Sequence, residues 1–137
     1  MLEEKDYLKK QINLLARVLK ALLTLSLKKG DNIEERLKEA VDDDILGHHI
    51  DLWLKMDGAE YESALKKKTE DAKTIKQFLY IQLEISAQYF SKNELDKSLF
   101  YFKKSEITKN YYDSISATYD FTILKKYNQL KNVLDEI

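Results

Sequence analysis

The chain contains no cysteine and no proline, and it has only three glycines in 137 residues. Without cysteine the protein has no disulfide, no zinc–thiolate centre and no cysteine nucleophile. This absence is typical of the reducing cytoplasm, where we expect the protein to be located. β-Rich folds need many tight turns, which glycine and proline form most readily, so the scarcity of both residues favours helices joined by short loops.

Long uncharged apolar runs are missing as well. The most apolar stretch, residues 12–27, is interrupted by Arg17 and Lys20 and is too short to cross a bilayer. The first six residues include Glu3, Glu4 and Asp6, which is too much charge for a secretory signal. The sequence therefore predicts a soluble protein without membrane insertion.

Charge is distributed unevenly along the chain. Residues 1–30 carry a net charge of +4, residues 31–62 carry −8 and residues 63–137 carry +3, which leaves −1 for the whole. This distribution favours complementarity within or between molecules over a general affinity for nucleic acid. Lysine also outnumbers arginine by 21 to 2, whereas nucleic-acid binders depend strongly on the bidentate arginine side chain. We expect no nucleic-acid partner.

Apolar residues recur at spacings of three and four through most of the sequence, which predicts helices. We expect an all-α fold of one domain, residues 1–137, in which about six to seven antiparallel helices form a compact array with a long N-terminal and a long C-terminal helix. The expected helices and their signals are 3–29 ended by Gly30, 32–46 capped by Asp31 or Asn32 and ended by Gly47, a short helix with Ile50, Trp53 and Leu54, 58–68 opened by an Asp57 capping box, 69–91 opened by Thr69, 95–108 closed by Asn110, and a last helix from Tyr112 to Ile137.

The first of these helices is apolar on more than one side. Its two apolar stripes are Leu8, Ile12, Leu15, Leu19 and Leu22, and beside them Leu14, Val18, Ala21 and Leu25. A helix of this kind must be covered over most of its circumference. One neighbouring helix cannot cover it all, so the sequence predicts a further contact, with a partner or with a second copy of the chain.

Residues from about 79 to 112 carry a pattern of small and aromatic side chains on two helices around the turn 92–94. The pattern consists of Ser86 and Tyr89 on the first helix and Ser98, Phe102 and Ser105 on the second. It resembles one tetratricopeptide repeat, a helix–turn–helix unit in which small residues mark the closest approach of the helices. The pattern departs from the family at Gln82, where an aromatic residue is common, and at Asn110, where proline is common.

The residues 6–12, the apolar helix after them, the turn 29–31 and this hairpin are together similar to an uncharacterised bacterial family of small all-helical proteins, a domain of unknown function. That resemblance implies a helical fold and no assigned activity. The tetratricopeptide resemblance implies a peptide-binding groove on the first helix of the hairpin, and the corresponding partner-binding residues here are Tyr80, Leu83, Ala87, Phe90 and Ser91. A single repeat does not build such a groove alone, so this face is either open or covered by a terminal helix.

The acidic segment 42–51, which contains both histidines, supplies an alternative function. Asp44, His48 and Asp51 would share one face of an unbroken helix and offer oxygen and nitrogen ligands to a divalent metal or a small ligand. The other interpretation is an acidic helix end with two surface histidines. No nucleophile motif and no glycine-rich phosphate loop is present, so we expect neither an enzyme nor a cofactor.

The sequence thus predicts a non-catalytic helical scaffold that binds a protein partner or associates with itself, for example as a homodimer through the N-terminal helix.

Overall fold

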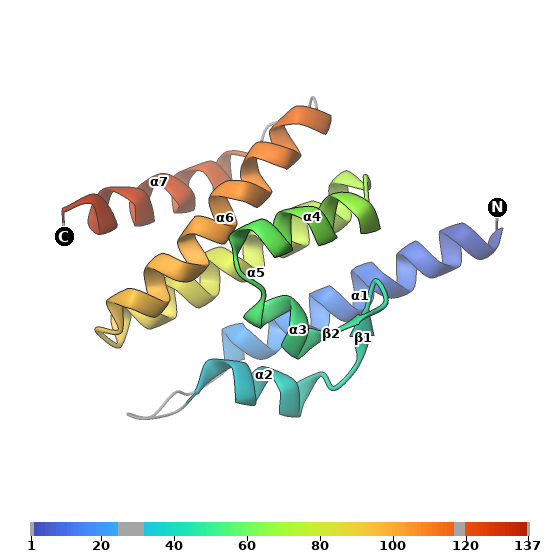
Figure 1. The fold of residues 1–137 in the computed structure, drawn as a ribbon, viewed down its shortest axis with the longest axis horizontal. Helices are drawn as coiled ribbons and strands as arrows, with labels where there is room; N and C mark the ends of the chain where they lie inside the picture. The colour runs from blue at the N-terminus through green and yellow to red at the C-terminus, as the bar shows by residue number, and fades with distance from the viewer. Residues whose placement is uncertain (1, 25–31, 117–119, 137) are drawn as a thin grey trace.

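The computed structural model describes residues 2–24, 32–116 and 120–136 of the chain. The described part is almost entirely helical, which confirms the predicted all-α array (Figure 1). Its elements are α1 (Leu2–Thr24), α2 (Ile33–Ala40), β1 (Asp44–Ile45), β2 (His48–His49), α3 (Ile50–Lys55), α4 (Gly58–Lys68), α5 (Ala72–Ser91), α6 (Leu95–Ile115) and α7 (Phe121–Asp135).

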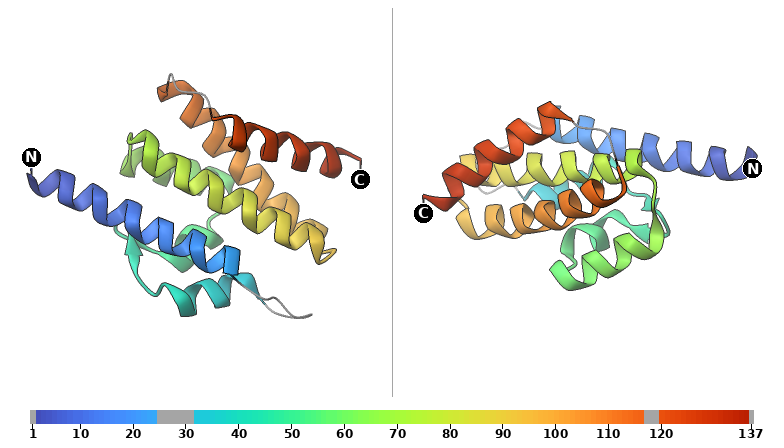
Figure 2. Two further views of the ribbon diagram at one scale, coloured as in Figure 1. Left: turned by 180° about the vertical axis from the view of Figure 1, so that it is seen from behind. Right: turned by 90° about the horizontal axis from the view of Figure 1, so that it is seen from above.

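The array is organised around α5. Helices α5 and α6 form an antiparallel hairpin, and α1 and α7 lie on either side of α5 across the back of the molecule (Figure 2, left). Helix α7 runs in the same direction as α5, because Asp120 at its start contacts Lys76 whereas Lys126 contacts Glu84. The short elements from α2 to α4 cover the opposite side, and the first turns of α1 extend beyond the other helices (Figure 2, right).

Helix α1 follows its predicted course as far as Thr24. The predicted end at Gly30 lies outside the described residues. Helix α2 begins where expected, because the Asn32 side chain accepts a hydrogen bond from the Glu35 backbone N–H.

The predicted extension of α2 to residue 46 is wrong. The helix ends at Ala40 with Val41 as its C-cap, and the three aspartates that follow carry negative charge that opposes the dipole at a helix C-terminus. A two-residue antiparallel hairpin follows, with Asp44 opposite His49. Its turn uses positive φ values at Leu46 and Gly47, so Gly47 allows a turn and does not end a helix.

Contacts from other parts of the chain stabilise this hairpin. The buried Gln11 of α1 accepts a hydrogen bond from the Leu46 backbone N–H at 2.7 Å. On the other side, the Trp53 indole N–H donates to the Ile45 carbonyl at 2.6 Å. These two hydrogen bonds compensate for the unfavourable backbone conformation at Leu46.

Helices α3 and α4 confirm their predictions. The Asp57 side chain accepts a hydrogen bond from the Glu60 backbone N–H and thereby caps α4. The three lysines 66–68 form the last turn of α4, where positive charge suits the helix dipole. Thr69 ends α4 and does not open α5; the N-cap of α5 is Asp71, which accepts from the Thr74 backbone N–H.

The α5–α6 hairpin brings its two helices closest together at a pair of buried serines. The Ser86 hydroxyl donates to the Ser98 carbonyl and the Ser98 hydroxyl to the Ser86 carbonyl, both at 2.8 Å. The turn at residues 92–94 is present as predicted, with Asn93 in the left-handed conformation. The small residues that the sequence pattern singled out therefore lie where the two helices cross.

Asn110 does not close α6, which continues to Ile115. The added turns are held by tertiary contacts, because the Tyr111 hydroxyl donates to the Thr69 carbonyl at 2.7 Å and Tyr112 is buried. Tyr112 and Ile115 consequently belong to α6, and the last helix begins only at Phe121.

Most of the buried apolar residues that the structure describes form two clusters. The first cluster is built from all six helices α1 through α6 and from the β1–β2 hairpin. Its members include Leu15, Val18, Leu37, Trp53 and Tyr61. The second cluster lies between α5, α6 and α7 and consists of Leu79, Leu83, Phe102, Ile123, Tyr127, Leu130 and Leu134. Over the residues that the structure describes, no helix is both long and apolar enough to cross a membrane.

Candidate functional site

The five residues assigned to a partner-binding groove all lie on α5, but the structure separates them into two environments. Leu83 is fully buried in the second cluster, with Tyr80 and Phe90 half-buried at the edge of that cluster. Ala87 also touches this cluster, yet together with the exposed Ser91 it lines an open groove towards α1. Helix α7 thus covers part of the predicted groove face of α5. Of the five predicted residues, Ala87 and Ser91 line the open groove.

Two ion pairs and one hydrogen bond among the described residues hold α7 against α5. The Asp120 carboxylate, which caps α7 by accepting from the Ile123 backbone N–H, also pairs with Lys76 at 2.7 Å and accepts from the Tyr80 hydroxyl at 3.2 Å. The Lys76 ammonium holds the pKa of Asp120 below its usual value, and Asp120 in turn raises the pKa of Lys76. Glu84 and Lys126 form the second ion pair.

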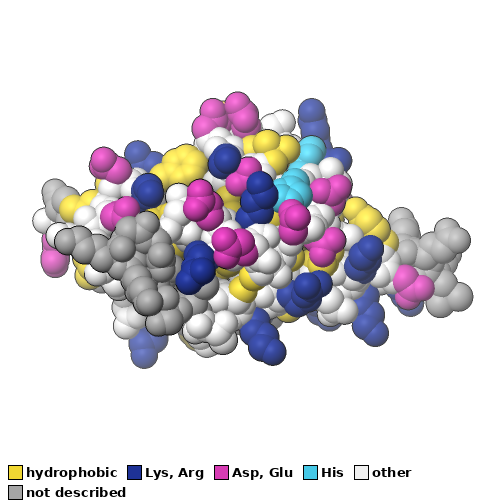
Figure 3. Space-filling view, turned by 90° about the horizontal axis from the view of Figure 1, so that it is seen from below, with side chains coloured by type: hydrophobic (Ala, Val, Ile, Leu, Met, Phe, Trp, Pro, Cys, Tyr) yellow, Lys and Arg dark blue, Asp and Glu magenta, His cyan; other side chains and the backbone are white. Residues whose placement is uncertain are grey.

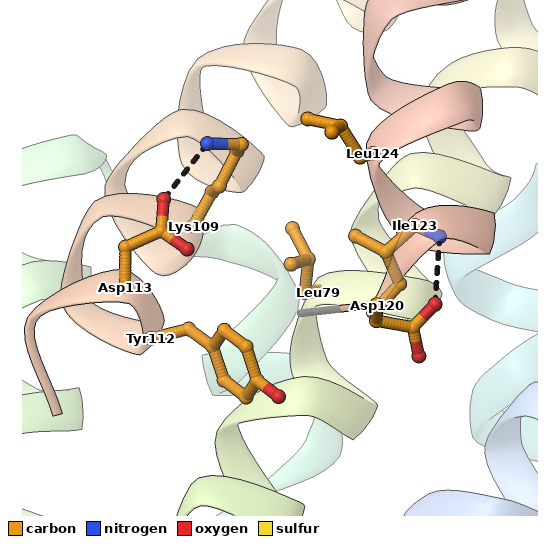
Figure 4. Close-up of a pocket in the computed structure, with 7 residues that line it drawn as sticks. All are labelled: Leu79, Lys109, Tyr112, Asp113, Asp120, Ile123 and Leu124. Carbon is orange, nitrogen blue, oxygen red and sulfur yellow. Dashed lines mark hydrogen bonds and ion pairs between the residues drawn. The ribbon is translucent and has the colours of Figure 1, made fainter. Parts of the chain in front are cut away.

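A small cavity remains beneath this contact (Figure 4). Leu79, Ile123 and Leu124 form its apolar lining, and the Lys109–Asp113 ion pair of 2.8 Å closes one side. Its volume of about 30 Å³ accommodates one or two water molecules but no organic ligand. The cavity is therefore a packing feature of the α7 contact.

The open groove has a volume of about 340 Å³ and lies between the last turns of α1 and the end of α5. We call it the α1–α5 groove, and it is lined by Leu22, Leu23, Glu84, Ala87, Gln88, Ser91 and Lys92. The Leu23 side chain is 63% exposed, whereas its neighbour Leu22 is fully buried. Leu23 belongs to neither of the two stripes predicted for α1, so it was not identified from the sequence as a candidate. The sequence feature that could have identified it is a leucine outside both apolar stripes.

The polar contact between α1 and α5 is incomplete. The Gln88 side-chain N–H donates to the Leu22 carbonyl at 2.9 Å, but Gln88 Oε1 is buried and has no hydrogen-bond partner among the described residues. The same is true of Gln77 Oε1, which lies three helical turns earlier on the same side of α5. Buried acceptors without a partner destabilise a contact, so α1 is held mainly by apolar packing.

The acidic segment 42–51 does not form the arrangement that the metal hypothesis required. The unbroken helix is replaced by the hairpin, in which His49 bonds Asp42 at 2.5 Å and His48 packs edge-on against Trp53. Within the described residues no group of three or more His, Asp or Glu side chains could hold a metal ion. On the face shown in Figure 3, both acidic and basic side chains surround the two histidines.

A buried charged cluster lies between α2, α3 and α6. Lys104 is only 2% exposed, and its ammonium donates to the Trp53 and Leu54 carbonyls, at 2.7 and 3.1 Å, at the end of α3. The rings of Tyr61, Phe100 and Tyr101 surround this ammonium within 5.6 Å. Burial lowers the pKa of Lys104 to about 8.

The carboxylate of Glu34 completes the cluster by accepting hydrogen bonds from the Tyr89 and Tyr101 hydroxyls. Burial and this carboxylate raise the pKa of both tyrosines. The Lys104 ammonium is hydrogen-bonded within the protein and is buried from solvent, so we interpret the cluster as a structural contact that holds α2, α3 and the α5–α6 hairpin together. Sequence patterns offer no signal for a lysine that points into a core.

The chain matches no family model, no curated protein and no solved structure. The functional interpretation therefore depends on the geometry of the chain itself.

Proposed function

We propose that this protein is a non-catalytic helical interaction module that binds a protein partner, or a second copy of itself, at the α1–α5 groove. The observation that carries the proposal is the exposed Leu23 side chain beside a floor of small residues, Ala87 and Ser91. An exposed large apolar side chain beside small ones leaves a space that side chains of a partner can fill, and the contact buries apolar surface. The proposed location is the cytoplasm, in keeping with the lack of cysteine.

A relation to tetratricopeptide repeats is part of this proposal. It is supported by the crossing of α5 and α6 at Ser86 and Ser98. The departure at Gln82 has a local reason, because its buried amide oxygen accepts from the Thr108 hydroxyl at 2.6 Å, and Thr108 lies 2.6 Å from the Tyr61 hydroxyl. An aromatic side chain at this position would remove the acceptor of that chain of hydrogen bonds.

The proposal is tested with Leu23→Asp, which places a charge in the groove. The matched control is Leu52→Asp on α3, since Leu52 is also an exposed leucine but does not line the groove. Light scattering at micromolar concentration measures self-association, and affinity capture from the source cell with mass spectrometry measures partner binding. We expect Leu23→Asp to abolish the dimer or the captured partner, and Leu52→Asp to retain it.

A wild-type protein that is monomeric and captures no partner sensitive to Leu23→Asp contradicts the proposal. The obvious alternative variant, Leu83→Asp, is unsuitable, because Leu83 is fully buried and its substitution would disrupt the second cluster.

A further inference from the structure

The α1–α5 groove is one end of a longer strip on α5. Between α1 and α7, α5 presents side chains that are only partly buried or exposed, at helical spacing: Lys73, Gln77, Tyr80, Glu84, Ala87 and Ser91. The strip is bounded by α1 on one side and α7 on the other along the back of the molecule (Figure 2, left). It ends in the open groove at Ala87 and Ser91, where the floor consists of small side chains.

The α1 wall of this strip combines apolar and basic residues. Residues seven apart lie on the same side of a helix, so the exposed Leu23 shares its side of α1 with Lys9, and the half-buried Leu19 shares its side with Lys5. Lys20 lies three residues before Leu23 and is exposed. These three lysines make no ion pair within the described parts of the chain.

Negative charge on the strip is already neutralised. Glu84 pairs with Lys126 of α7, and Asp120 at the far edge pairs with Lys76. Lys73 on α5 is exposed and, like the lysines of α1, makes no ion pair with any residue that the structure describes. The base of the strip is therefore of mixed polarity, with Tyr80 and Ala87 as its apolar members, and its α1 side is basic.

The occupant must satisfy its own backbone. Extended peptides bind by pairing their N–H and C=O groups with a free backbone edge, but the strip is formed by helices, whose backbone groups are bonded internally. A helix needs no such pairing, and small residues at Ala87 and Ser91, four apart, allow a second helix to approach closely.

We propose that this strip binds an amphipathic helix of a partner protein whose apolar face meets Leu23 and whose flanks carry aspartate or glutamate. The inference rests on the proposed function and narrows it to a partner other than the chain itself. A two-fold contact through this side of α1 would bring the surface that carries Lys5, Lys9 and Lys20 against the same basic surface of a second copy, and like charges in contact oppose association.

The test uses a displayed library of designed amphipathic helices with fixed leucines at helical spacing and flanking positions randomised among Glu, Lys, Gln and Ser. The full-length wild-type protein is the bait. We expect the selected helices to carry glutamate at their flanks. A synthetic selected helix should lose affinity by about ten-fold or more for Leu23→Asp and for the triple variant Lys5→Glu, Lys9→Glu, Lys20→Glu, and weaken as salt is raised.

Two further variants complete the test: the first should abolish binding, and the second is the control. Ser91→Arg fills the floor of the groove from an exposed position, so it should also abolish binding without disturbing the core. The pair Lys67→Glu, Lys68→Glu changes exposed lysines at the end of α4, remote from the strip, and should alter the affinity less than about two-fold. Circular dichroism confirms that each variant is folded.

The possible results separate the two proposals. Selected helices that lose affinity for Leu23→Asp but show no preference for glutamate overturn the acidic partner and leave the groove in place. Selected helices that bind Leu23→Asp and Ser91→Arg as well as wild type contradict the groove itself. A dimer that Leu23→Asp dissolves, with no helix selected, overturns this inference and supports self-association.

Discussion

At the scale of single residues, the buried Lys104 combines a stabilising contact with a buried charge. Its ammonium satisfies the Trp53 and Leu54 carbonyls at the end of α3, where a helix leaves backbone acceptors without partners. The cost is the desolvation of a charge, which lowers the pKa of Lys104 from 10.5 to about 8. A burial cost and a capping benefit thus oppose each other at one atom.

This opposition predicts a pH dependence of stability. Between pH 8 and 10.5 the unfolded chain retains a proton on Lys104 that the folded protein has released, so the free energy of unfolding rises with pH in this window. From pH 7.5 to 9.5 we expect wild type to gain about 2 kcal/mol relative to Lys104→Met, measured by urea unfolding. The matched control is Lys103→Met, because Lys103 is the exposed neighbour; a difference between wild type and Lys104→Met that stays constant with pH contradicts the assignment.

At the scale of elements, α7 is held against α5 and α6 by one apolar face and a few polar contacts. Its apolar face, Ile123, Tyr127, Leu130 and Leu134, packs in the second cluster, and Asp120 fixes its first turn by capping the helix and by pairing with Lys76. The start of α7 is therefore the part whose loss should release the helix from α5.

We expect Asp120→Ala to destabilise α7 locally by about 1–2 kcal/mol, since it removes an N-cap and an ion pair together. Hydrogen exchange should become faster for the amides of residues 121–135 and remain unchanged in α1. Asp113→Ala provides the control, because the exposed Asp113 pairs only with Lys109 on its own helix. Equal acceleration of hydrogen exchange in both variants, or acceleration in α1 as well, would contradict the role of Asp120 in holding α7 against α5.

At the scale of the whole molecule, α5 joins the two apolar clusters. Phe78, Ile81, Ile85 and Tyr89 face the first cluster, whereas Leu79 and Leu83 face the second. Because one rigid helix carries both sets of side chains, disruption of one cluster should be felt in the other.

The single tryptophan, Trp53, lies in the first cluster and reports on it alone. We expect Leu83→Ala in the second cluster to lower the free energy of unfolding by about 2–4 kcal/mol and to shift the Trp53 fluorescence transition together with the loss of helical circular dichroism. Leu99→Ala, a partly buried position at the edge of the same cluster, should cause a smaller shift. A Trp53 transition that Leu83→Ala leaves in place would show that the clusters unfold independently.

The sequence by itself determined the helices, because their signals are local. The caps at Asn32 and Asp57 and the turn at Asn93 depend on residues within one helical turn, and the structure places all three as predicted. The small residues at the α5–α6 crossing were equally visible, because a close approach of helices requires small side chains at fixed spacing.

Only the tertiary structure decided where two elements end and which surface is open. The hairpin at Leu46 and Gly47 depends on Gln11, 35 residues before Leu46, and on Trp53 of the helix that follows it. The extension of α6 past Asn110 depends on Thr69, 42 residues before the tyrosine that contacts it. The exposure of Leu23 and the burial of Leu83 depend on how α1 and α7 lie against α5. The sequence pattern does not distinguish an exposed leucine from a buried one, because that difference depends on which helices pack beside it.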